Sequence, residues 1–446
     1  MTSDTLADRM RDISRTRSWR LPVICAGIPL VATFILAMVR RQVDLGTYLM
    51  GGTHAFGANL YQVLYPPTGL GFTYPPLAAM LFVPLAHLPK RVDQVAFSWV
   101  NVALLFGLLA VSLRAVGPTL ERRVVVWWAL VLVLPAGFLD PIRETVLLGQ
   151  VNLLVALLVI ADMTLDLRLP RGVLVGLAAA IKITPVILIP YLFLTRQTRA
   201  GLRATGVFVA AAAVAAAASP HATWRYWSHE LWYPAHTGNV AWIGNQGIVG
   251  VVERAVGHQL TSTSTFTLVV VVGGIGLAVA AVAYRRLSPL LGLLAVEAVE
   301  SLASPVSWSH HFVWVVLLIA WLALGADRPA HGDWWAVGVA IVFWAAPIWW
   351  VHHGSDLTYV GRGWLTPVSS SFFIVLAAFV VATAIAVIRR SSGSGLAASS
   401  DDDGHDSSRT DASQLHDHLV PGVDRLVEDD PGLTCQEPRR SLRTSP

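Results

Sequence analysis

Residues 172–194 read GVLVGLAAAIKITPVILIPYLFL, an apolar run in which Lys182 is the only charged residue. About 20 apolar residues make a helix long enough to cross a lipid bilayer. The pattern recurs along the chain, since 54% of its 446 residues are hydrophobic and only 13% are charged. Soluble domains have roughly one quarter charged residues. The composition therefore predicts an all-α polytopic membrane protein and excludes a soluble enzyme, a disordered scaffold and a disulfide-stapled secreted protein.

The apolar runs predict about twelve membrane-spanning helices, joined by functional loops on the outer face. The strong candidates are 21–39, 94–113, 124–139, 146–165, 172–194, 202–219, 266–284, 312–325, 334–351 and 369–388. Two weaker candidates are 75–88, which is short and flanked by proline, and 288–303, which carries Glu297 and Glu300 and is either a span or partly re-entrant.

Charge divides the chain into three parts. Residues 1–20 are basic, residues 21–390 form the membrane body, and residues 391–446 carry eleven acidic and five basic residues. The last part is rich in Ser, Asp and Gly and is expected to be a disordered cytoplasmic tail. The basic surplus of the body is spread over its loops, so the sequence does not predict a nucleic-acid partner.

Arginine placement predicts the orientation, because cytoplasmic loops carry an excess of Lys and Arg. Five arginines precede residue 21, which predicts cytoplasmic N- and C-termini in a plasma-membrane protein. With twelve spans, the basic loops at 90–91, 196–203, 285–286 and 389–390 lie inside. The aromatic segments lie outside: 40–74, 220–265, 304–311 and 352–368.

Two arginine-bearing loops disagree with this twelve-span map. Arg114, Arg122 and Arg123 fall outside, and so do Arg168 and Arg171. Either these loops bind anionic lipid, or the span count between 75 and 171 is wrong. Omitting the weak span 75–88 would move both loops inside, but it would require one more crossing before Arg196.

Polar residues within a membrane body are costly and therefore informative. Asp44, just beyond the first span, could act as a general base or pair with Arg40 or Arg41 nearby. Lys182 lies in the middle of an apolar run and needs an anion, either a lipid phosphate or a carboxylate on another helix.

Two further polar groups stand out. The stretch 304–311, SPVSWSHH, opens an outer-side helix, where free N–H groups and a histidine suit a phosphate. Adjacent histidines project in different directions on a helix, which disfavours zinc. Gly149-Gln150-Val151-Asn152, with Arg143 and Glu144 upstream, suits sugar hydroxyls or phosphate, or helix–helix hydrogen bonds in lipid. The twelve-span map turns this group toward the cytoplasm.

Nucleotide-binding and esterase motifs are absent from the sequence. An enzyme with its polar surface outside must then use an activated substrate carried by the membrane, such as a sugar linked to a lipid phosphate. A transporter or flippase of a lipid-linked sugar or glycolipid remains open. Transporters often contain inverted repeats with paired broken helices, which the sequence does not reveal.

Several segments in order then resemble a known family. They are Asp44, NLYQ (59–62), FTYPPLAAMLFVPLAHLP (72–89), GQVNLLVALLVIAD (149–162), GLAAAIKITPVILIPYL (176–192), IGNQGIVG (243–250) and SPVSWSHHFVW (304–314). Over roughly residues 40–385 the chain resembles the actinobacterial polyprenyl-phosphate-mannose-dependent α-mannosyltransferases of glycosyltransferase family 87, in the GT-C superfamily. One departure is Gly247, where a hydroxyl residue is expected after Asn-Gln.

The resemblance implies an inverting transfer of mannose on the outer face, without a cofactor. The donor is polyprenyl-phosphate-mannose, and the acceptor is a phosphatidylinositol mannoside, lipomannan or lipoarabinomannan, which gains an α-1,2 linkage. The catalytic base matches Asp44. The expected donor and phosphate contacts are His310, His311, Lys182 and Arg41. The expected acceptor or sugar contacts are Tyr48, Tyr74, Asn245, Gln246 and Trp308.

The residues fit this chemistry, because inversion needs one base and a stabilised leaving group rather than the carboxylate pair of a retaining enzyme. No DxD pair lies in an outer loop, so we expect no metal requirement. Transfer of another polyprenyl-linked sugar, such as arabinose, stays possible because fold does not set substrate.

Overall fold

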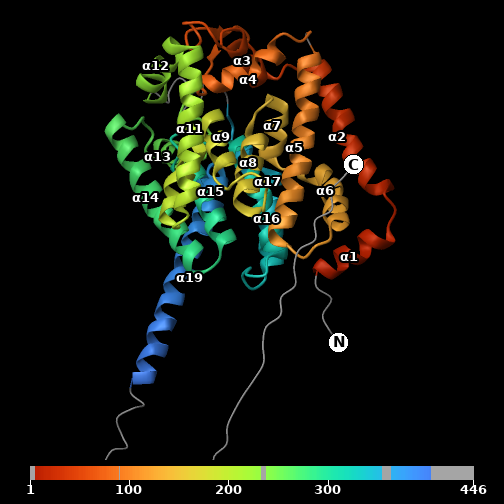
Figure 1. Ribbon diagram of the computed structural model, residues 1–446, viewed down its shortest axis with the longest axis vertical. Helices are drawn as coiled ribbons and strands as arrows, with labels where there is room; N and C mark the ends of the chain where they lie inside the picture. Colours follow the sequence, from red (N-terminus) through yellow and green to blue (C-terminus); the bar gives the residue numbers. More distant parts are fainter. Residues whose placement is uncertain (1–5, 90, 233–237, 354–362, 403–446) are drawn as a thin grey trace, which may run out of the picture. The chain divides into compact units, whose positions relative to one another are not determined.

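The structure, a computed structural model, describes residues 6–89, 91–232, 238–353 and 363–402 (Figure 1). These residues are mostly helical, and six helices are long and apolar enough to cross a membrane, or seven if a pair bent by 79° counts as one span. The predicted all-α polytopic class is confirmed, whereas the count of about twelve spans is not. Several of the predicted spans are short helices whose ends meet inside the body.

The elements follow one another along the chain without large sheets. The helices of the first half are α1 (Leu6–Thr16), α2 (Arg20–Val39), α3 (Val43–Thr53), α4 (Pro76–Ala86), α5 (Val92–Val116), α6 (Arg122–Ala136), α7 (Asp140–Leu148), α8 (Asn152–Thr164), α9 (Val173–Ile181), η1 (Thr184–Ile187), α10 (Leu188–Leu194) and α11 (Thr198–Ala218). Two short antiparallel strands, β1 (Leu64–Tyr65) and β2 (Leu70–Gly71), form a hairpin between α3 and α4.

The second half continues in the same way. Its helices are α12 (Pro220–Ser228), η2 (Glu230–Trp232), α13 (Ile248–Val256), α14 (Ser262–Arg286), α15 (Pro289–Ala303), η4 (Ser309–Trp314), α16 (Val315–Leu324), α17 (Gly332–Ala345), η5 (Pro347–Trp350), η6 (Gly363–Leu365), α18 (Thr366–Ser369) and α19 (Ser371–Asp402). Helix α19 continues to Asp402, and residues 403–446 lie outside the described residues. The disordered tail expected at 391–446 stays a prediction.

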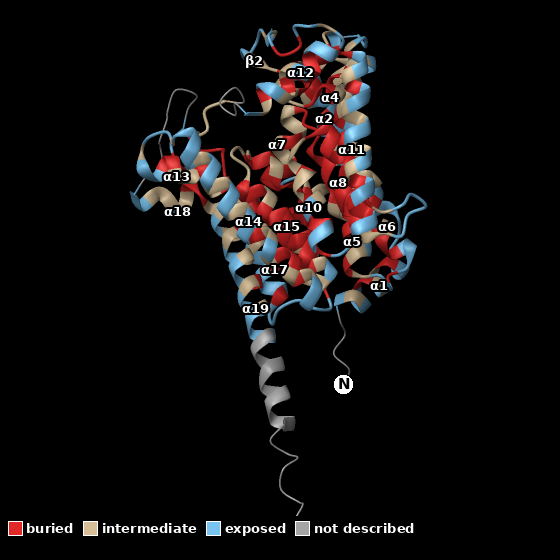
Figure 2. Cartoon of the chain, turned by 60° about the vertical axis from the view of Figure 1, so that its left-hand side comes forward, coloured by how far each residue is buried: buried red, intermediate tan, exposed pale blue. Residues whose placement is uncertain are grey.

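Local sequence explains where several of these helices begin. The hydroxyl of Thr261 accepts a hydrogen bond from the Ser264 amide at the start of α14, and Ser288 caps α15 through the amide of Leu291. Pro76 and Pro289 occupy the first positions of α4 and α15, where proline costs no hydrogen bond. The buried residues concentrate in the centre of the body, where the short helices meet (Figure 2).

The segment 173–194, which we call the lysine segment, does not cross the body. Its two ends lie side by side, because a Cβ on Gly172 would come within 2.1 Å of the Ala200 carbonyl oxygen, and Arg171 donates to Gln197. The helix breaks at Lys182, whose backbone is extended, and the chain returns through η1 and α10. The span predicted from 172–194 is therefore re-entrant.

The segment 289–324, the histidine segment, is built in a similar way. At its two ends Asp327 accepts hydrogen bonds from the Ser288 hydroxyl and, at 2.7 Å, from the Trp321 indole. The chain turns between α15 and η4, at the SPVSWSHH motif. The sequence had raised a partly re-entrant course for 288–303, but it had taken 172–194 as a crossing.

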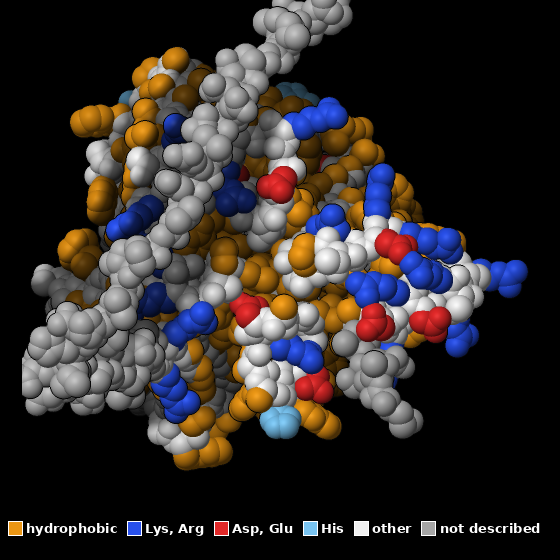
Figure 3. All heavy atoms as spheres, turned by 60° about the horizontal axis from the view of Figure 1, so that its bottom comes forward, with side chains coloured by type: hydrophobic (Ala, Val, Ile, Leu, Met, Phe, Trp, Pro, Cys, Tyr) orange, Lys and Arg blue, Asp and Glu red, His pale blue; other side chains and the backbone are white. Residues whose placement is uncertain are grey.

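The two arginine-bearing loops that disagreed with the twelve-span map lie on the same side of the body as the other basic segments. On α1, Arg15 pairs with Glu121 and Arg11 donates to Thr119, so the α5–α6 loop lies beside the basic N-terminal helix. Residues 171 and 197 are hydrogen-bonded, so the α8–α9 loop lies beside the basic loop before α11. Arginine side chains accordingly spread over one face of the body, which we call the arginine face (Figure 3). It includes Arg11, Arg15 and Arg171.

Helices α3, α4 and α12 lie at the opposite end of the body (Figures 1 and 2). Helix α4, expected as a weak span at 75–88, packs against α3 there. Arg91 belongs to this end as well, since its guanidinium donates to the carbonyl oxygens of Ala37 and Arg40 at the close of α2. The placement of loop 90–91 on the same side as Arg196 is therefore wrong, and Lys90 lies outside the described residues.

Candidate active site

Asp44 lies in the first turn of α3, where a carboxylate is favoured by the helix dipole. It is partly buried, and its Oδ2 accepts a hydrogen bond of 2.6 Å from Nε2 of Gln150. Burial raises the pKa of Asp44 to about 6, against the lowering effects of the Gln150 hydrogen bond and the Lys182 charge. A carboxyl with this pKa is a competent general base near neutral pH.

Gln150 connects Asp44 to two of the predicted sugar-contacting tyrosines. Its Oε1 accepts hydrogen bonds from the hydroxyls of Tyr48 and, at 3.1 Å, of Tyr74, and these two hydroxyl oxygens are 2.9 Å apart. Both ends of the amide are engaged, so its orientation and the position of the carboxylate are fixed together.

Gly149 lets the α7–α8 turn approach α3 this closely. Its φ of +77° is left-handed, and a Cβ there would lie 2.6 Å from Cβ of Leu45 and 3.0 Å from Cβ of Gln42. A side chain at position 149 would separate Gln150 from Asp44. The glycine in the GQVN motif is thus part of the construction of the site.

Lys182 lies where the lysine segment turns. Its ammonium donates to Oδ1 of Asn152 at 2.6 Å and is 5.6 Å from the centre of the Tyr74 ring. The carboxylates that act on its charge are Glu300 and Asp44. Which anion compensates Lys182, a carboxylate on another helix or a lipid phosphate, stays a prediction.

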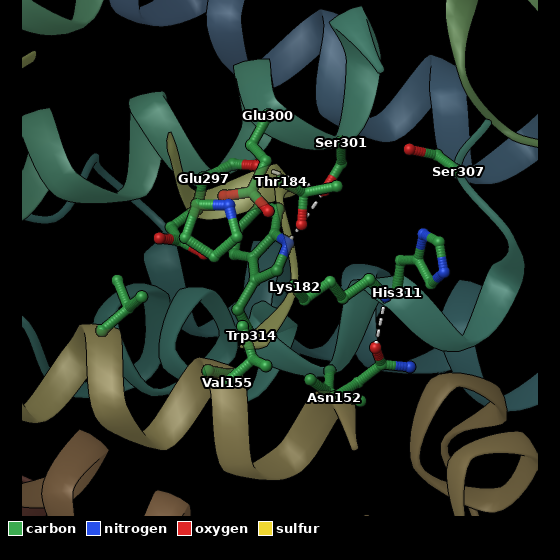
Figure 4. Close-up of a pocket in the computed structure, with 14 residues that line it drawn as sticks. Asn152, Val155, Lys182, Thr184, Glu297, Glu300, Ser301, Ser307, His311 and Trp314 are labelled. Atoms are coloured by element: carbon green, nitrogen blue, oxygen red, sulfur yellow. Dashed lines mark hydrogen bonds between the residues drawn. The ribbon is translucent and has the colours of Figure 1, made fainter. Parts of the chain in front are cut away.

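Lys182 also lines a cavity between the lysine and histidine segments (Figure 4). Glu297 and Glu300 reach it from α15, and the hydroxyl of Thr184 donates to Glu300. The remaining polar lining residues are Asn152, Ser301, Ser307 and His311. The cavity therefore joins residues from three separate stretches of sequence.

The two histidines of the motif occupy different positions. His311 lines the cavity, whereas His310 is buried and its backbone carbonyl accepts hydrogen bonds from Asn152 at 2.8 Å and Thr145 at 3.2 Å. Their rings contact each other at right angles, with centroids 4.9 Å apart. His311 is the one on the same cavity as Lys182.

Two other predicted contacts, Asn245 and Gln246, lie in the loop before α13. Asn245 and Gln246 are fully buried, and their amides bind backbone atoms: Asn245 accepts from the amides of Gly247 and Ser307, and Gln246 donates to Ser369. They hold the 238–247 loop against the turn that contains Trp308. Their contact with sugar stays a prediction.

Two other predicted contacts are also placed. Arg41 is exposed, and Trp308 is partly exposed beside Trp242. Their roles stay predictions as well.

The sequence did not predict that Gln150 and Asn152 bind Asp44 and Lys182. The sequence singled out the GQVN motif, but the span map turned it away from Asp44. The sequence signal that could have shown this is Gly149. A glycine next to a polar pair at a helix boundary indicates that another backbone approaches closely.

Within the described residues, no group of three or more His, Cys, Asp or Glu side chains is arranged to hold a metal ion. Metal-independent transfer stays a prediction that activity in the presence of a chelator would test.

Residues 72–307 match the sequence model of Glycosyltransferase family 87, a match that runs from the residue after β2 to the turn before η4. The chain belongs to glycosyltransferase family 87. The predicted family is thus confirmed, and the protein is a glycosyltransferase.

Curated relatives agree with this membership. The chain is 31% identical, over 74% of its length and 83% of the relative, to a polyprenol-phosphate-mannose-dependent alpha-(1-2)-phosphatidylinositol mannoside mannosyltransferase of Mycobacterium tuberculosis. It is 32% identical, over 74% of its length and 82% of the relative, to a polyprenol-phosphate-mannose-dependent alpha-(1-2)-phosphatidylinositol pentamannoside mannosyltransferase of Mycolicibacterium smegmatis. No solved structure matches significantly.

Proposed function

We propose that this family 87 glycosyltransferase transfers mannose from polyprenyl-phosphate-mannose to a phosphatidylinositol mannoside, forming an α-1,2 linkage with inversion. The observation that carries the proposal is the Asp44–Gln150 pair, which holds one carboxylate of raised pKa beside two tyrosine hydroxyls. The names of the relatives support the donor and the acceptor class. Lipomannan and lipoarabinomannan, which are larger mannosylated glycolipids, fall within the same proposal.

In the proposed reaction, the acceptor hydroxyl oxygen attacks the anomeric carbon of the donor mannose. The bond from that carbon to the phosphate oxygen breaks, and its electron pair leaves with the polyprenyl phosphate. Asp44 takes the hydroxyl proton. A single carboxylate suffices for this inverting step.

The departing phosphate needs positive charge and hydrogen-bond donors. We assign this role to Lys182 and His311, which line one cavity, with Arg41 as a further cation at the exposed end of α2. Tyr48 and Tyr74 are assigned to the sugar, because their hydroxyls share Gln150 with the base.

We further propose that the arginine face is cytoplasmic and that Asp44 faces the outer side of the plasma membrane. The gathering of arginine side chains on this face supports the orientation (Figure 3). The lipid-linked donor would then reach the site from within the bilayer.

The test uses purified protein, polyprenyl-phosphate-mannose and phosphatidylinositol mannosides, with products read by mass and linkage. We expect an acceptor heavier by one hexose through an α-1,2 bond, and Asp44→Asn to lose at least about a hundredfold of the rate. Asp166→Asn is the matched control, since Asp166 is exposed in the α8–α9 loop.

Near-normal turnover by Asp44→Asn would remove the proposed base. Transfer of arabinose but not mannose would identify a different donor sugar. Movement of the glycolipid across a vesicle membrane without a gain in mass would indicate a transporter instead.

A further inference from the structure

Three tryptophans meet at the end of α7 that is remote from Asp44. The ring centroid of Trp242 lies 5.6 Å from that of Trp308 and 5.4 Å from that of Trp349. The rings are inclined by 66° and 49°, so they form a corner rather than a stack. All three are partly exposed, and we call them the tryptophan corner.

The tryptophan corner is tied to charged residues of α7. The Trp349 indole donates to Oδ1 of Asp140 at 2.8 Å, and Arg143 pairs with the same oxygen at 2.6 Å. Asp140 is fully buried, so it acts as an anchor. The side chains of Arg143 and Glu144 are 39% and 24% exposed, so they can reach a ligand.

This combination suits a hexose. A pyranose ring presents an apolar C–H face that packs on an indole, and its hydroxyl groups bind carboxylates and guanidinium groups, as in other ligand sites where few polar groups orient an apolar contact. Other, far more exposed tryptophans lack this setting: Trp224, Trp232, Trp350 and Trp364 are 67–84% exposed, as expected of residues at a lipid interface.

The length of helix α7 gives the approximate separation between the tryptophan corner and the proposed base. Asp140 opens the helix and Leu148 closes it, which corresponds to about 12 Å along the axis. Gln150, the partner of Asp44, follows directly. The separation is longer than one hexose ring and comparable with a short oligosaccharide.

We infer that the tryptophan corner, with Arg143 and Glu144, is a second acceptor subsite that binds an inner sugar of an oligomannosyl chain while its terminal hydroxyl reaches Asp44. The inference rests on the proposed function. It narrows the acceptor to glycolipids that already carry several hexoses, and it makes the corner a determinant of acceptor length.

The experiment compares octyl α-mannoside with an octyl mannotrioside as acceptors, with polyprenyl-phosphate-mannose as donor. The readout is the ratio of kcat/KM for the long acceptor to that for the short one, which does not depend on the amount of folded enzyme. We expect wild-type protein to prefer the trioside, and Trp308→Ala to lower the ratio by about tenfold, the scale of one lost aromatic contact.

Trp350→Ala is the matched control, because Trp350 follows Trp349 in η5 but is 69% exposed and bonds to the Ala345 carbonyl. Its ratio should stay at the wild-type value. An unchanged ratio in Trp308→Ala, an equal fall in both variants, or a wild-type enzyme without preference for the trioside would overturn the inference. Absence of transfer to either acceptor by wild-type protein would instead overturn the proposed function, and the subsite with it.

Discussion

The surroundings of Asp44 have opposite effects on the pKa of its carboxyl group. Burial raises its pKa to about 6, and the hydrogen bond from Gln150 lowers it, as does the positive charge of Lys182. A general base must be ionised to accept a proton, so the active form is present above this pKa and is lost as the pH falls through it. With Asp44 as the proposed base, we expect the acidic limb of the pH profile to report on the Asp44–Gln150 pair.

We predict that kcat/KM falls about tenfold per pH unit below about pH 6. In Gln150→Leu the limb should move to higher pH, because the hydrogen bond that lowers the pKa is removed. Steady-state rates measured from about pH 4.5 to about pH 8.5, a range that brackets the titration of the carboxyl group, would show both effects. A limb at the same pH in wild-type and Gln150→Leu protein would mean that another group titrates.

The sequence identified Asp44 but not its partner. A lone acid after an apolar run is conspicuous, and Tyr48 lies one helical turn later on the same face. Gln150 is 106 residues away, and amides inside a membrane protein more often connect helices. Nothing in the local pattern shows which distant acid an amide will meet.

At the scale of elements, the site is assembled from helix ends. The start of α3, the α7–α8 turn, the break at Lys182 and the turn before η4 all contribute residues. Each apolar run was visible in the sequence, but hydropathy reports length and composition rather than direction. The lysine segment is as apolar as a true span, and only the contact of Gly172 with Ala200 reveals that it turns back.

We predict that Gly149→Ala separates two of these elements. The left-handed backbone disfavours alanine, and its Cβ would overlap Leu45, so the variant should lose about 1–3 kcal/mol of stability. The displacement of Gln150 should lower kcat by about a hundredfold. Thermal unfolding in detergent and initial rates would measure the two effects.

Gly69→Ala is the control for backbone strain alone. Its φ of +70° is also left-handed, but no atom lies within 4 Å of the added Cβ. It should lose only about 1 kcal/mol and keep wild-type turnover. Equal turnover in the two variants would contradict the role of the α7–α8 turn.

For the whole molecule, the proposed orientation rests on the grouping of the arginines. The sequence predicted a basic inner face, yet it left two loops on the wrong side because it counted 75–88 as a span and 172–194 as a crossing. In the structure both corrections occur together: α4 stays at the end of the body that carries Asp44, and the lysine segment returns to the end from which it starts. The arginine face then contains both loops.

Cysteine labelling distinguishes this arrangement from the twelve-span map. In a background with Cys25→Ser and Cys435→Ser, we would introduce Thr68→Cys near β2 and Arg168→Cys in the α8–α9 loop, two exposed positions. The twelve-span map places both positions outside, whereas the structure places them at opposite ends of the body.

With a membrane-impermeant maleimide, we expect Thr68→Cys to react in intact spheroplasts and Arg168→Cys to react only after permeabilisation, because the arginine face should be cytoplasmic. Reaction of both in intact spheroplasts would restore the twelve-span map, and the reverse pattern would put Asp44 on the cytoplasmic side, where the proposed donor and acceptor geometry no longer holds.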